Sequence, residues 1–214
     1  MKILNLYACL GGNRLKWNDV RDDIEVTAVE LDSELARLYK ERFPNDEVVV
    51  GDAHEYLLNN YEKFDFIWSS PPCPSHSKSR YARKETTKPL FPDLKLYEEV
   101  IFLDYWFDGK YVVENVTPYY DPLIHGKKRG RHIYWTNFNL PNDLRERKSG
   151  IMEGKNEVER WCEFHEYDFR KYKGEQRLDK IARNLVDYEA GRTIFETVLG
   201  IIRKSNDKQM ELFL

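Results

Sequence analysis

The chain has 214 residues, of which 41% are hydrophobic, and these values predict a folded globular protein of about one domain rather than a disordered one. The net charge of −3 gives no global attraction for an anionic partner, so any binding of nucleic acid must depend on local basic patches. No apolar run approaches the length of a membrane span, and the first residues predict a strand rather than a signal peptide. The three cysteines are widely spaced, which fits a reducing cytoplasm without a disulfide framework.

The first part of the chain alternates apolar runs with segments of helical period. We predict strands at residues 2–7, 25–31, 47–50 and 64–68, and helices at 33–43 and 53–61; a further helix can begin within 13–20. Ser33 is the expected N-cap of the helix at 33–43. Strands that alternate with helices in this way favour an α/β fold with a doubly wound, mostly parallel sheet.

The remaining elements are less regular. Residues 75–92 are polar and basic and predict a loop, which is followed by a helix at 94–106 and strands at 111–113 and 131–135. Residues 136–180 are rich in charge and poorly periodic, and 190–203 predict a helix near the carboxyl end. We therefore divide the chain into a core (1–135), a charged region (136–180), a helical segment that completes the core (181–204) and a tail (205–214).

Cys73 stands directly after the apolar run at 64–68, within the turn Ser70-Pro71-Pro72-Cys73. The prolines end the strand because proline cannot continue a hydrogen-bonded ladder. The cysteine is thus expected on a stiff turn at the carboxyl end of a strand, where open α/β sheets bind their ligands. A thiol at this position can be a nucleophile, although a single cysteine is more often inert and partly buried.

Three features at neighbouring strand ends predict an adenosine site. Gly11-Gly12 form a turn after the first strand, Glu30 ends the second, and Asp52 follows the third. The full glycine-rich phosphate fingerprint is absent, which disfavours a dinucleotide and favours S-adenosylmethionine. Each acid alone would more often be an ordinary helix-capping residue, so the prediction depends on the three features together.

Several segments together resemble the DNA (cytosine-5)-methyltransferases, and most closely the short forms from bacteria and their phages, which often belong to restriction-modification systems. They are residues 5–12 (Asn5-Leu6-Tyr7-Ala8-Cys9-Leu10-Gly11-Gly12), Ser70-Pro71-Pro72-Cys73, Glu114-Asn115-Val116, residues 129–134 (Arg129-Gly130-Arg131-His132-Ile133-Tyr134) and, less closely, Arg183-Asn184-Leu185-Val186. They occur in the order found in the family, and the likeness covers residues 1–135 and 181–203. The chain departs from the family pattern at Asn5, Cys9, Pro74 and Lys127.

The resemblance implies transfer of a methyl group from S-adenosylmethionine to carbon 5 of cytosine, with S-adenosylhomocysteine as the second product and no metal. It assigns attack on carbon 6 to Cys73, stabilisation at ring N3 to Glu114, and contacts with the base or its phosphates to Arg129 and Arg131. The Glu114 role requires a carboxyl whose pKa is raised by burial. The residues implied at the cofactor are Tyr7, Ala8, Gly11, Gly12, Asn13, Glu30, Leu31, Asp52, Ala53, Ser70, Pro72 and Asn184.

The implied partner is double-stranded DNA, from which the target cytosine must be flipped out of the stack. A basic loop that follows Cys73 is suited to grip phosphates and close over the base. Its predicted DNA contacts are Ser77, Lys78, Arg80, Arg83 and Lys84. Residues 136–180 would then be a reduced target-recognition region, which predicts a short or relaxed target, or specificity from the catalytic loop or a second subunit.

Other classes of function stay open at this stage. An amino-methyltransferase acting on adenine N6 or cytosine N4 would carry an aromatic residue at the position of Cys73. An RNA methyltransferase can use a similar cysteine, and a degenerate relative could bind DNA or cofactor without catalysis. Cys162 and His165 form a C-x-x-H pair, which is only half of a zinc site.

The last six residues carry a separate hypothesis. Residues 209–214 (Gln209-Met210-Glu211-Leu212-Phe213-Leu214) resemble the Gln-x-x-Leu-Phe peptide by which bacterial proteins dock on the replication sliding clamp. A tail that places two large apolar side chains in a pocket is a plausible mode of docking. The alternative is a tail that packs on its own domain.

Overall fold

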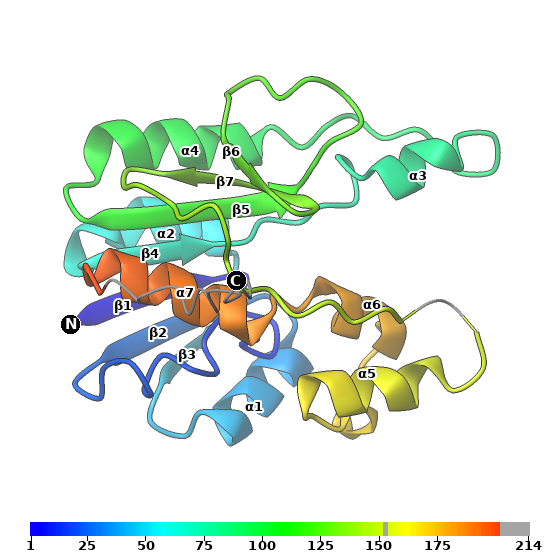
Figure 1. Ribbon diagram of the computed structural model, residues 1–214, viewed down its shortest axis with the longest axis horizontal. Helices are drawn as coiled ribbons and strands as arrows, with labels where there is room; N and C mark the ends of the chain where they lie inside the picture. Colours follow the sequence, from blue (N-terminus) through cyan, green and yellow to red (C-terminus); the bar gives the residue numbers. More distant parts are fainter. Residues whose placement is uncertain (152–153, 202–214) are drawn as a thin grey trace, which may run out of the picture.

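The computed structural model describes residues 1–151 and 154–201, and within them seven strands form one sheet (Figure 1). The order across the sheet is β3-β2-β1-β4-β5-β7-β6. The first five strands in this order are parallel, whereas β7 runs antiparallel to both β5 and β6. The bounds are β1 (Lys2–Leu6), β2 (Glu25–Glu30), β3 (Glu47–Val50), β4 (Phe66–Ser69), β5 (Lys110–Val116), β6 (Lys127–Arg129) and β7 (His132–Thr136). The predicted α/β fold with a doubly wound, mostly parallel sheet is confirmed.

Helices cover both faces of the sheet because each face is apolar. On one face α2 (Ala53–Asn60) and α4 (Lys95–Trp106) pack over the central strands through a cluster that includes Leu57, Ile67 and Leu103. On the other face α7 (Tyr188–Val198) packs through Trp17, Trp68 and Phe195. The helix α1 (Ser33–Arg42) also flanks the sheet, and a short helix η1 (Tyr61–Lys63) precedes β4.

Two parts of the chain extend beyond the carboxyl ends of the parallel strands (Figure 1). One is the segment with α3 (Lys78–Ala82), which follows β4, and the other contains α5 (Glu157–His165), η2 (Phe169–Lys171) and α6 (Leu178–Asn184). The second part packs on α1 through an apolar cluster that joins Leu35 and Leu38 to Trp161, Phe169 and Ile181. The two parts flank the edge of the sheet at which ligands bind in open α/β folds.

Several local predictions are corrected. No helix forms at residues 13–20, where the chain makes successive turns that are tied down by a buried ion pair between Arg14 and Asp46 at 2.9 Å. Asp32, not Ser33, caps α1, because its carboxylate accepts hydrogen bonds from the amides of Glu34 and Leu35. The loop at 75–92 contains α3, and the region at 136–180 contains α5 and η2.

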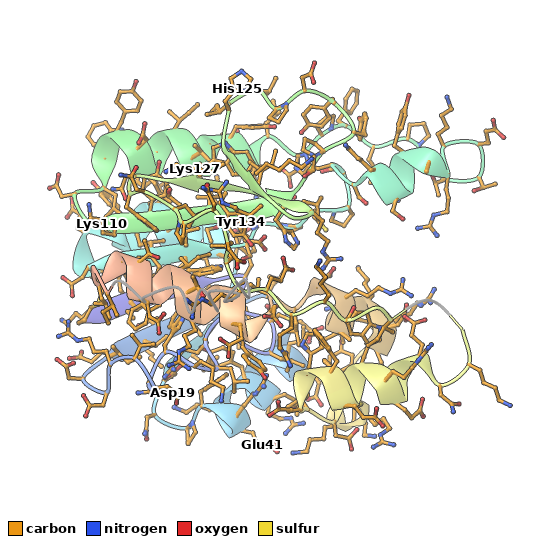
Figure 2. The ribbon with its side chains drawn as sticks, in the orientation of Figure 1. Asp19, Glu41, Lys110, His125, Lys127 and Tyr134 are labelled. Atoms are coloured by element: carbon orange, nitrogen blue, oxygen red, sulfur yellow. The ribbon has the colours of Figure 1, made fainter. Side chains whose placement is uncertain are left out.

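The hairpin at the edge of the sheet was only half predicted, since β6 was missed. Lys127 on β6 donates to the hydroxyl of Thr136 and to the backbone carbonyl of Phe138, so it fastens the hairpin (Figure 2). Tyr134 on β7 is buried in the core beside it. Strand β5 runs to Val116, so Glu114 lies within the strand rather than after its end.

No helix in residues 1–151 and 154–201 is long and apolar enough to cross a membrane. The predicted tail peptide, Gln209–Leu214, and the end of the predicted helix at 190–203 lie outside the described residues.

Candidate active site

A cavity of about 700 Å³ opens at the carboxyl ends of the parallel strands, where the strand order reverses between β1 and β4. Most of the residues singled out from the sequence line it. They are Tyr7, Ala8, Gly12, Asn13, Glu30, Leu31, Asp52, Ala53, Ser70, Pro72, Cys73, Ser77, Glu114, Arg131 and Asn184. Residues that lie more than a hundred positions apart in the sequence therefore share one space.

The turn that carries Cys73 is held by hydrogen bonds from both sides. The side-chain amide of Asn115 donates to the carbonyl of Pro71 at 2.8 Å. The amides of His76 and Ser77 donate to the carbonyl of Cys73 at 3.0 and 3.1 Å. The backbone of the cysteine is thus fixed relative to β5, which supplies Asn115.

Glu114 lies beside Cys73 and is 8% exposed. Burial raises the pKa of its carboxyl to about 7, although a hydrogen bond with Ser70 and the charge of Arg131 act in the opposite direction. Its Oε2 atom is buried and has no hydrogen-bond partner in the described part of the chain. A carboxyl that keeps its proton near neutral pH can donate a hydrogen bond to a ring nitrogen.

The Cys73 thiol is not activated by its surroundings alone. Burial raises its pKa, and the nearby Glu114 raises it further. Arg131 and Lys180 lower it, because both cations favour the thiolate. A neutral Glu114 removes the largest opposing charge, so the two groups are suited to act together.

The two arginines of the later motif separate. Arg131 lines the cavity and donates to the backbone carbonyl of Arg183 at 3.1 Å. Arg129 does not line it: its guanidinium donates to the carbonyls of Pro141 and Leu140 at 2.5 and 3.1 Å. The physical reason is the tight turn at Gly130, with φ of +53°, after which the chain reverses direction.

The loop after β1 forms one wall of the cavity. Two of its non-glycine residues, Tyr7 and Cys9, have positive φ values of 55° and 48°, a conformation that costs of the order of 1–3 kcal/mol each and needs support from neighbours. Glu30 supplies part of that support, because its carboxylate accepts from the amide of Cys9 at 2.8 Å and from the amide of Asp32 at 2.9 Å. Burial raises the pKa of Glu30 despite these bonds.

The two glycines of the turn after β1 allow close packing around them. Gly11 does not line the cavity; its φ is +68°, and a side chain there would collide with the ring of Phe43 on the side of α1. Gly12 lines the cavity but also lies against the carbonyl of Val186, which a Cβ atom would approach to 2.3 Å. The pair therefore allows the segment at 184–186 and α1 to pack closely.

Asp52 caps α2 through the amides of His54 and Glu55, as an ordinary capping acid does. Its second oxygen lies 3.5 Å from the ammonium of Lys95, and Asp52 also lines the cavity. Asp52 therefore caps α2 and lines the cavity at the same time.

The basic segment after Cys73 begins at the cavity and leads away from it. Ser77 lines the cavity, and Lys78, Arg80, Arg83 and Lys84 lie on α3 or the turn that follows it. Tyr81 stacks on Tyr119 with ring centroids 4.7 Å apart, and the Lys84 ammonium lies over the Tyr81 ring. These ring contacts hold the segment that carries the cations.

Most charged and aromatic residues of the region at 136–180 have partners within the protein. Arg147 pairs with Asp187, Lys171 pairs with Glu41, and Trp161 is buried. Residues that sequence reasoning missed do face the cavity from this side and from the sheet: Gln176, Lys180, Asn115 and His132. Lys180 and Asn184 are four residues apart, so they lie on one side of a helix, whereas Ile181 and Ala182 are buried on the other. This pattern of polar and apolar residues is the sequence signal from which α6 could have been predicted.

Within the described residues, no group of three or more His, Cys, Asp or Glu side chains could hold a metal ion. His165 is buried and stacks on Trp161, so it belongs to the apolar cluster under α5. Burial lowers its pKa to about 4.

Comparison with known proteins bears on the amino-terminal part of the chain. The family model described as C-5 cytosine-specific DNA methylase matches residues 1–99. The resemblance to the cytosine-5 methylases is confirmed. No curated protein matches the chain.

Solved structures similar to this chain include a Spodoptera frugiperda DNMT2 variant (24% identity, TM-score 0.40), a TehB-like S-adenosylmethionine-dependent methyltransferase from Corynebacterium glutamicum (21%, 0.35) and TrmN from Thermus thermophilus (15%, 0.38). Each covers 54% of the chain. In turn, the chain spans 35%, 54% and 33% of the three proteins, respectively.

The cavity has features that suit S-adenosylmethionine. Glu30 offers a fixed carboxylate for hydroxyl groups, and Leu31, which is 72% exposed, offers an apolar surface beside it. The side-chain nitrogen of Asn5 is buried without a hydrogen-bond partner in the described part, and Asn5 lines the cavity. These residues fit the cofactor.

Proposed function

We propose that this protein transfers a methyl group from S-adenosylmethionine to carbon 5 of cytosine in double-stranded DNA through a covalent adduct with Cys73. The observation that carries the proposal is the convergence of Cys73, Glu114 and Arg131 on the same cavity as the residues suited to the cofactor. The family match over residues 1–99 supports the same reaction class.

Cys73 acts as the nucleophile. Its sulfur forms a bond to carbon 6 of cytosine, and the electron pair of the C5–C6 double bond makes carbon 5 nucleophilic. Carbon 5 gains the methyl group and S-adenosylhomocysteine is the leaving group. Carbon 5 then loses its proton to water, the electron pair of that C–H bond reforms the double bond, and the thiolate leaves carbon 6. A thiolate suits both steps because it is soft and easily expelled.

Glu114 and Arg131 stabilise the ring during this addition. A protonated Glu114, favoured by its burial, donates to ring N3 as negative charge develops there. Arg131 favours the Cys73 thiolate, lines the cavity and would bind the O2 atom or an adjacent phosphate.

The cofactor would be held by Glu30, Leu31, Asp52 and the loop at Tyr7, with Asn184 closing the far side. When bound, S-adenosylmethionine supplies an electrophilic methyl group. The protein orients it and excludes water from the space shared with Cys73.

Double-stranded DNA is the proposed substrate, with the target cytosine flipped into the cavity. Lys78, Arg80, Arg83 and Lys84 would contact phosphates. Because the region at 136–180 is short and several of its charges are paired internally, we propose a short or relaxed target sequence. Docking of Gln209–Leu214 on a sliding clamp is a separate proposal, tested by pull-down with and without these residues.

The reaction is tested with labelled S-adenosylmethionine and diverse duplexes, followed by mapping of methylated positions at base resolution. We expect 5-methylcytosine from the wild type and none from Cys73→Ala. Cys162→Ala is the matched control, because Cys162 lies on α5 outside the cavity. DNA with 5-fluorocytosine should trap the wild type covalently, since fluorine blocks loss of the substituent at carbon 5.

Three results would refute the proposal in different ways. Methyl transfer that survives Cys73→Ala excludes the nucleophile, methylation only of RNA or of an exocyclic amine excludes the substrate, and cofactor and DNA binding without transfer indicates a non-catalytic relative.

A further inference from the structure

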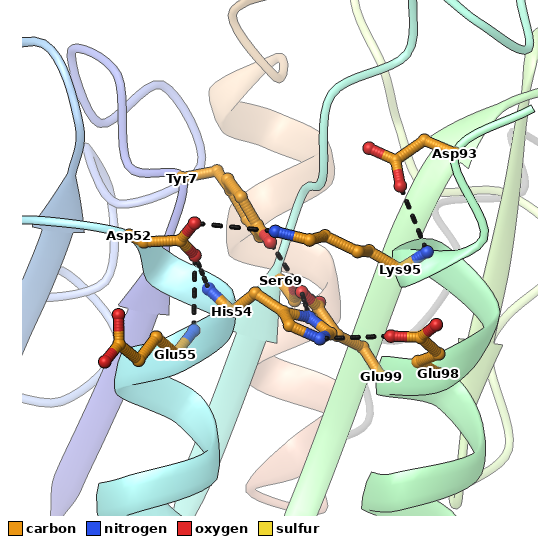
Figure 3. A network of polar contacts seen from close by, with 9 residues as sticks. All are labelled: Tyr7, Asp52, His54, Glu55, Ser69, Asp93, Lys95, Glu98 and Glu99. Carbon is orange, nitrogen blue, oxygen red and sulfur yellow. Dashed lines mark hydrogen bonds and ion pairs between the residues drawn. The ribbon is translucent and has the colours of Figure 1, made fainter. Parts of the chain in front are cut away.

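One buried carboxylate contacts the residue that begins the loop after β1 and the last residue of β4. Glu99, on α4, is 1% exposed. It accepts a hydrogen bond from the hydroxyl of Tyr7 at 2.5 Å and one from the hydroxyl of Ser69 at 2.5 Å. The two bonds use different oxygens of the carboxylate, so Glu99 bridges the two residues (Figure 3).

The two partners stand at the ends of adjacent strands. Ser69 is the last residue of β4, pairs with Leu6 of β1 and is followed by the turn that carries Cys73. Tyr7 comes directly after β1 and begins the loop that forms the cofactor wall. Glu99 therefore ties the proposed cofactor loop to the proposed nucleophile turn.

The bond to Tyr7 has a specific conformational consequence. Tyr7 has a φ of +55°, which a residue other than glycine adopts only when its surroundings hold it there. The hydroxyl bond to Glu99 fixes the far end of its side chain. Without this bond, the backbone can relax toward the ordinary region and displace the loop.

The charge of Glu99 is balanced from α2. Nδ1 of His54 lies 3.0 Å from Glu99, and Nε2 of the same ring lies 3.2 Å from Glu98 on the surface. Asp52 holds the amide of His54, and its other oxygen faces Lys95 (Figure 3). The carboxylate is therefore paired and hydrogen-bonded, as a buried charge requires.

We propose that Glu99 is a positioning residue that sets the separation between the cofactor loop and the Cys73 turn. It touches neither the reacting atoms nor the cavity, and it acts through Tyr7 on cofactor binding and through Ser69 on the nucleophile. This inference rests on the proposed function for its second half only, because binding of the cofactor can be measured without DNA.

The test separates the two halves with three variants. Tyr7→Phe should raise the Kd for S-adenosylhomocysteine, measured by calorimetry, about tenfold, while the single-turnover rate of adduct formation on 5-fluorocytosine DNA at saturating cofactor stays near that of the wild type. Ser69→Ala should lower that rate about tenfold and leave the Kd unchanged. Glu99→Gln should do both, and adding either partner variant to it should cause little further change.

Two variants on the same helix serve as matched controls. Tyr97→Phe removes a hydroxyl that contacts Tyr120, and Glu98→Gln alters the exposed carboxylate on the outer side of His54. Both should leave the Kd and the rate unchanged, which separates a positioning role from general loss of packing in α4.

The proposal is overturned if the three variants lower the unfolding temperature but alter neither the Kd nor the rate, or if the effects of Tyr7→Phe and Ser69→Ala persist in full on the Glu99→Gln background. A wild type that binds S-adenosylhomocysteine but forms no adduct refutes the proposed reaction instead, and the Kd of Tyr7→Phe then still decides whether Glu99 positions the cofactor loop.

Discussion

Replacement of Glu114 by Gln should make the protein more stable at alkaline pH while it abolishes activity. The wild-type carboxyl has its pKa raised from 4.5 to about 7 by burial. At about 1.4 kcal/mol per unit of pKa, ionising it inside the folded protein costs about 3 kcal/mol. Glutamine has a similar shape and cannot ionise, so it avoids this cost.

The sign of the effect follows from the two pKa values. The folded wild type holds the Glu114 proton to higher pH than the unfolded chain, so its stability is greatest below about pH 4.5, falls as pH rises toward 7, and then levels off. Glu114→Gln lacks this fall. The two proteins should be equally stable near pH 4.5, and the variant should be more stable by about 3 kcal/mol at pH 8.

Urea unfolding at pH 4.5 and pH 8 measures the difference, and 5-fluorocytosine trapping measures the loss of activity. Glu25→Gln, at an exposed carboxyl at the start of β2, is the control. It should have the same difference in free energy of unfolding between pH 4.5 and pH 8 as the wild type. If the free energies of unfolding of Glu114→Gln and the wild type differ by the same amount at both pH values, ionising Glu114 carries no desolvation cost. Its proposed role as a protonated donor is then refuted.

Three further predictions concern the framework of the site. The hydrogen bond with Glu99 raises the pKa of His54, so its contribution to stability should be present below about pH 6.5 and be lost as pH rises through the folded pKa; parallel melting-temperature curves for wild type and His54→Gln between pH 5 and 9 would contradict this. Asp46→Asn should lower the free energy of unfolding by about 3–5 kcal/mol, because it leaves buried Arg14 unpaired, and urea unfolding that matches the wild type would refute it. Asn115→Ala removes the hydrogen bond to the Pro71 carbonyl and should slow 5-fluorocytosine trapping about fivefold to tenfold in a folded protein. An unchanged rate would show that the Cys73 turn keeps its conformation without this bond.

Local sequence patterns predicted much of the fold because they report short-range physics. Apolar runs placed β1 to β4, and the alternation with helices predicted the parallel sheet. The errors have equally local causes. Ser33 and Asp32 are both good capping residues, and only the backbone geometry shows that Asp32 takes the role.

The arginine pair illustrates a prediction that sequence could not complete. Arg129 and Arg131 are separated by one residue and look alike in a motif, but the reversal at Gly130 sends one to the carbonyls of Pro141 and Leu140 and the other to the cavity. The register of a hairpin depends on pairing with its neighbours, which no short window contains.

The amino-acid sequence by itself determined the order of strands and helices in the core, the turn that carries Cys73 and the residue types suited to adding a thiol to a cytosine. Only the tertiary structure decided that Glu114 is buried beside Cys73, that Gly11 packs against Phe43, and that Glu99 bridges Tyr7 and Ser69. The reason is the range of the interactions: propensity and turn chemistry act over a few residues, whereas burial, pKa and shared cavities arise from contacts between segments that are distant in the chain.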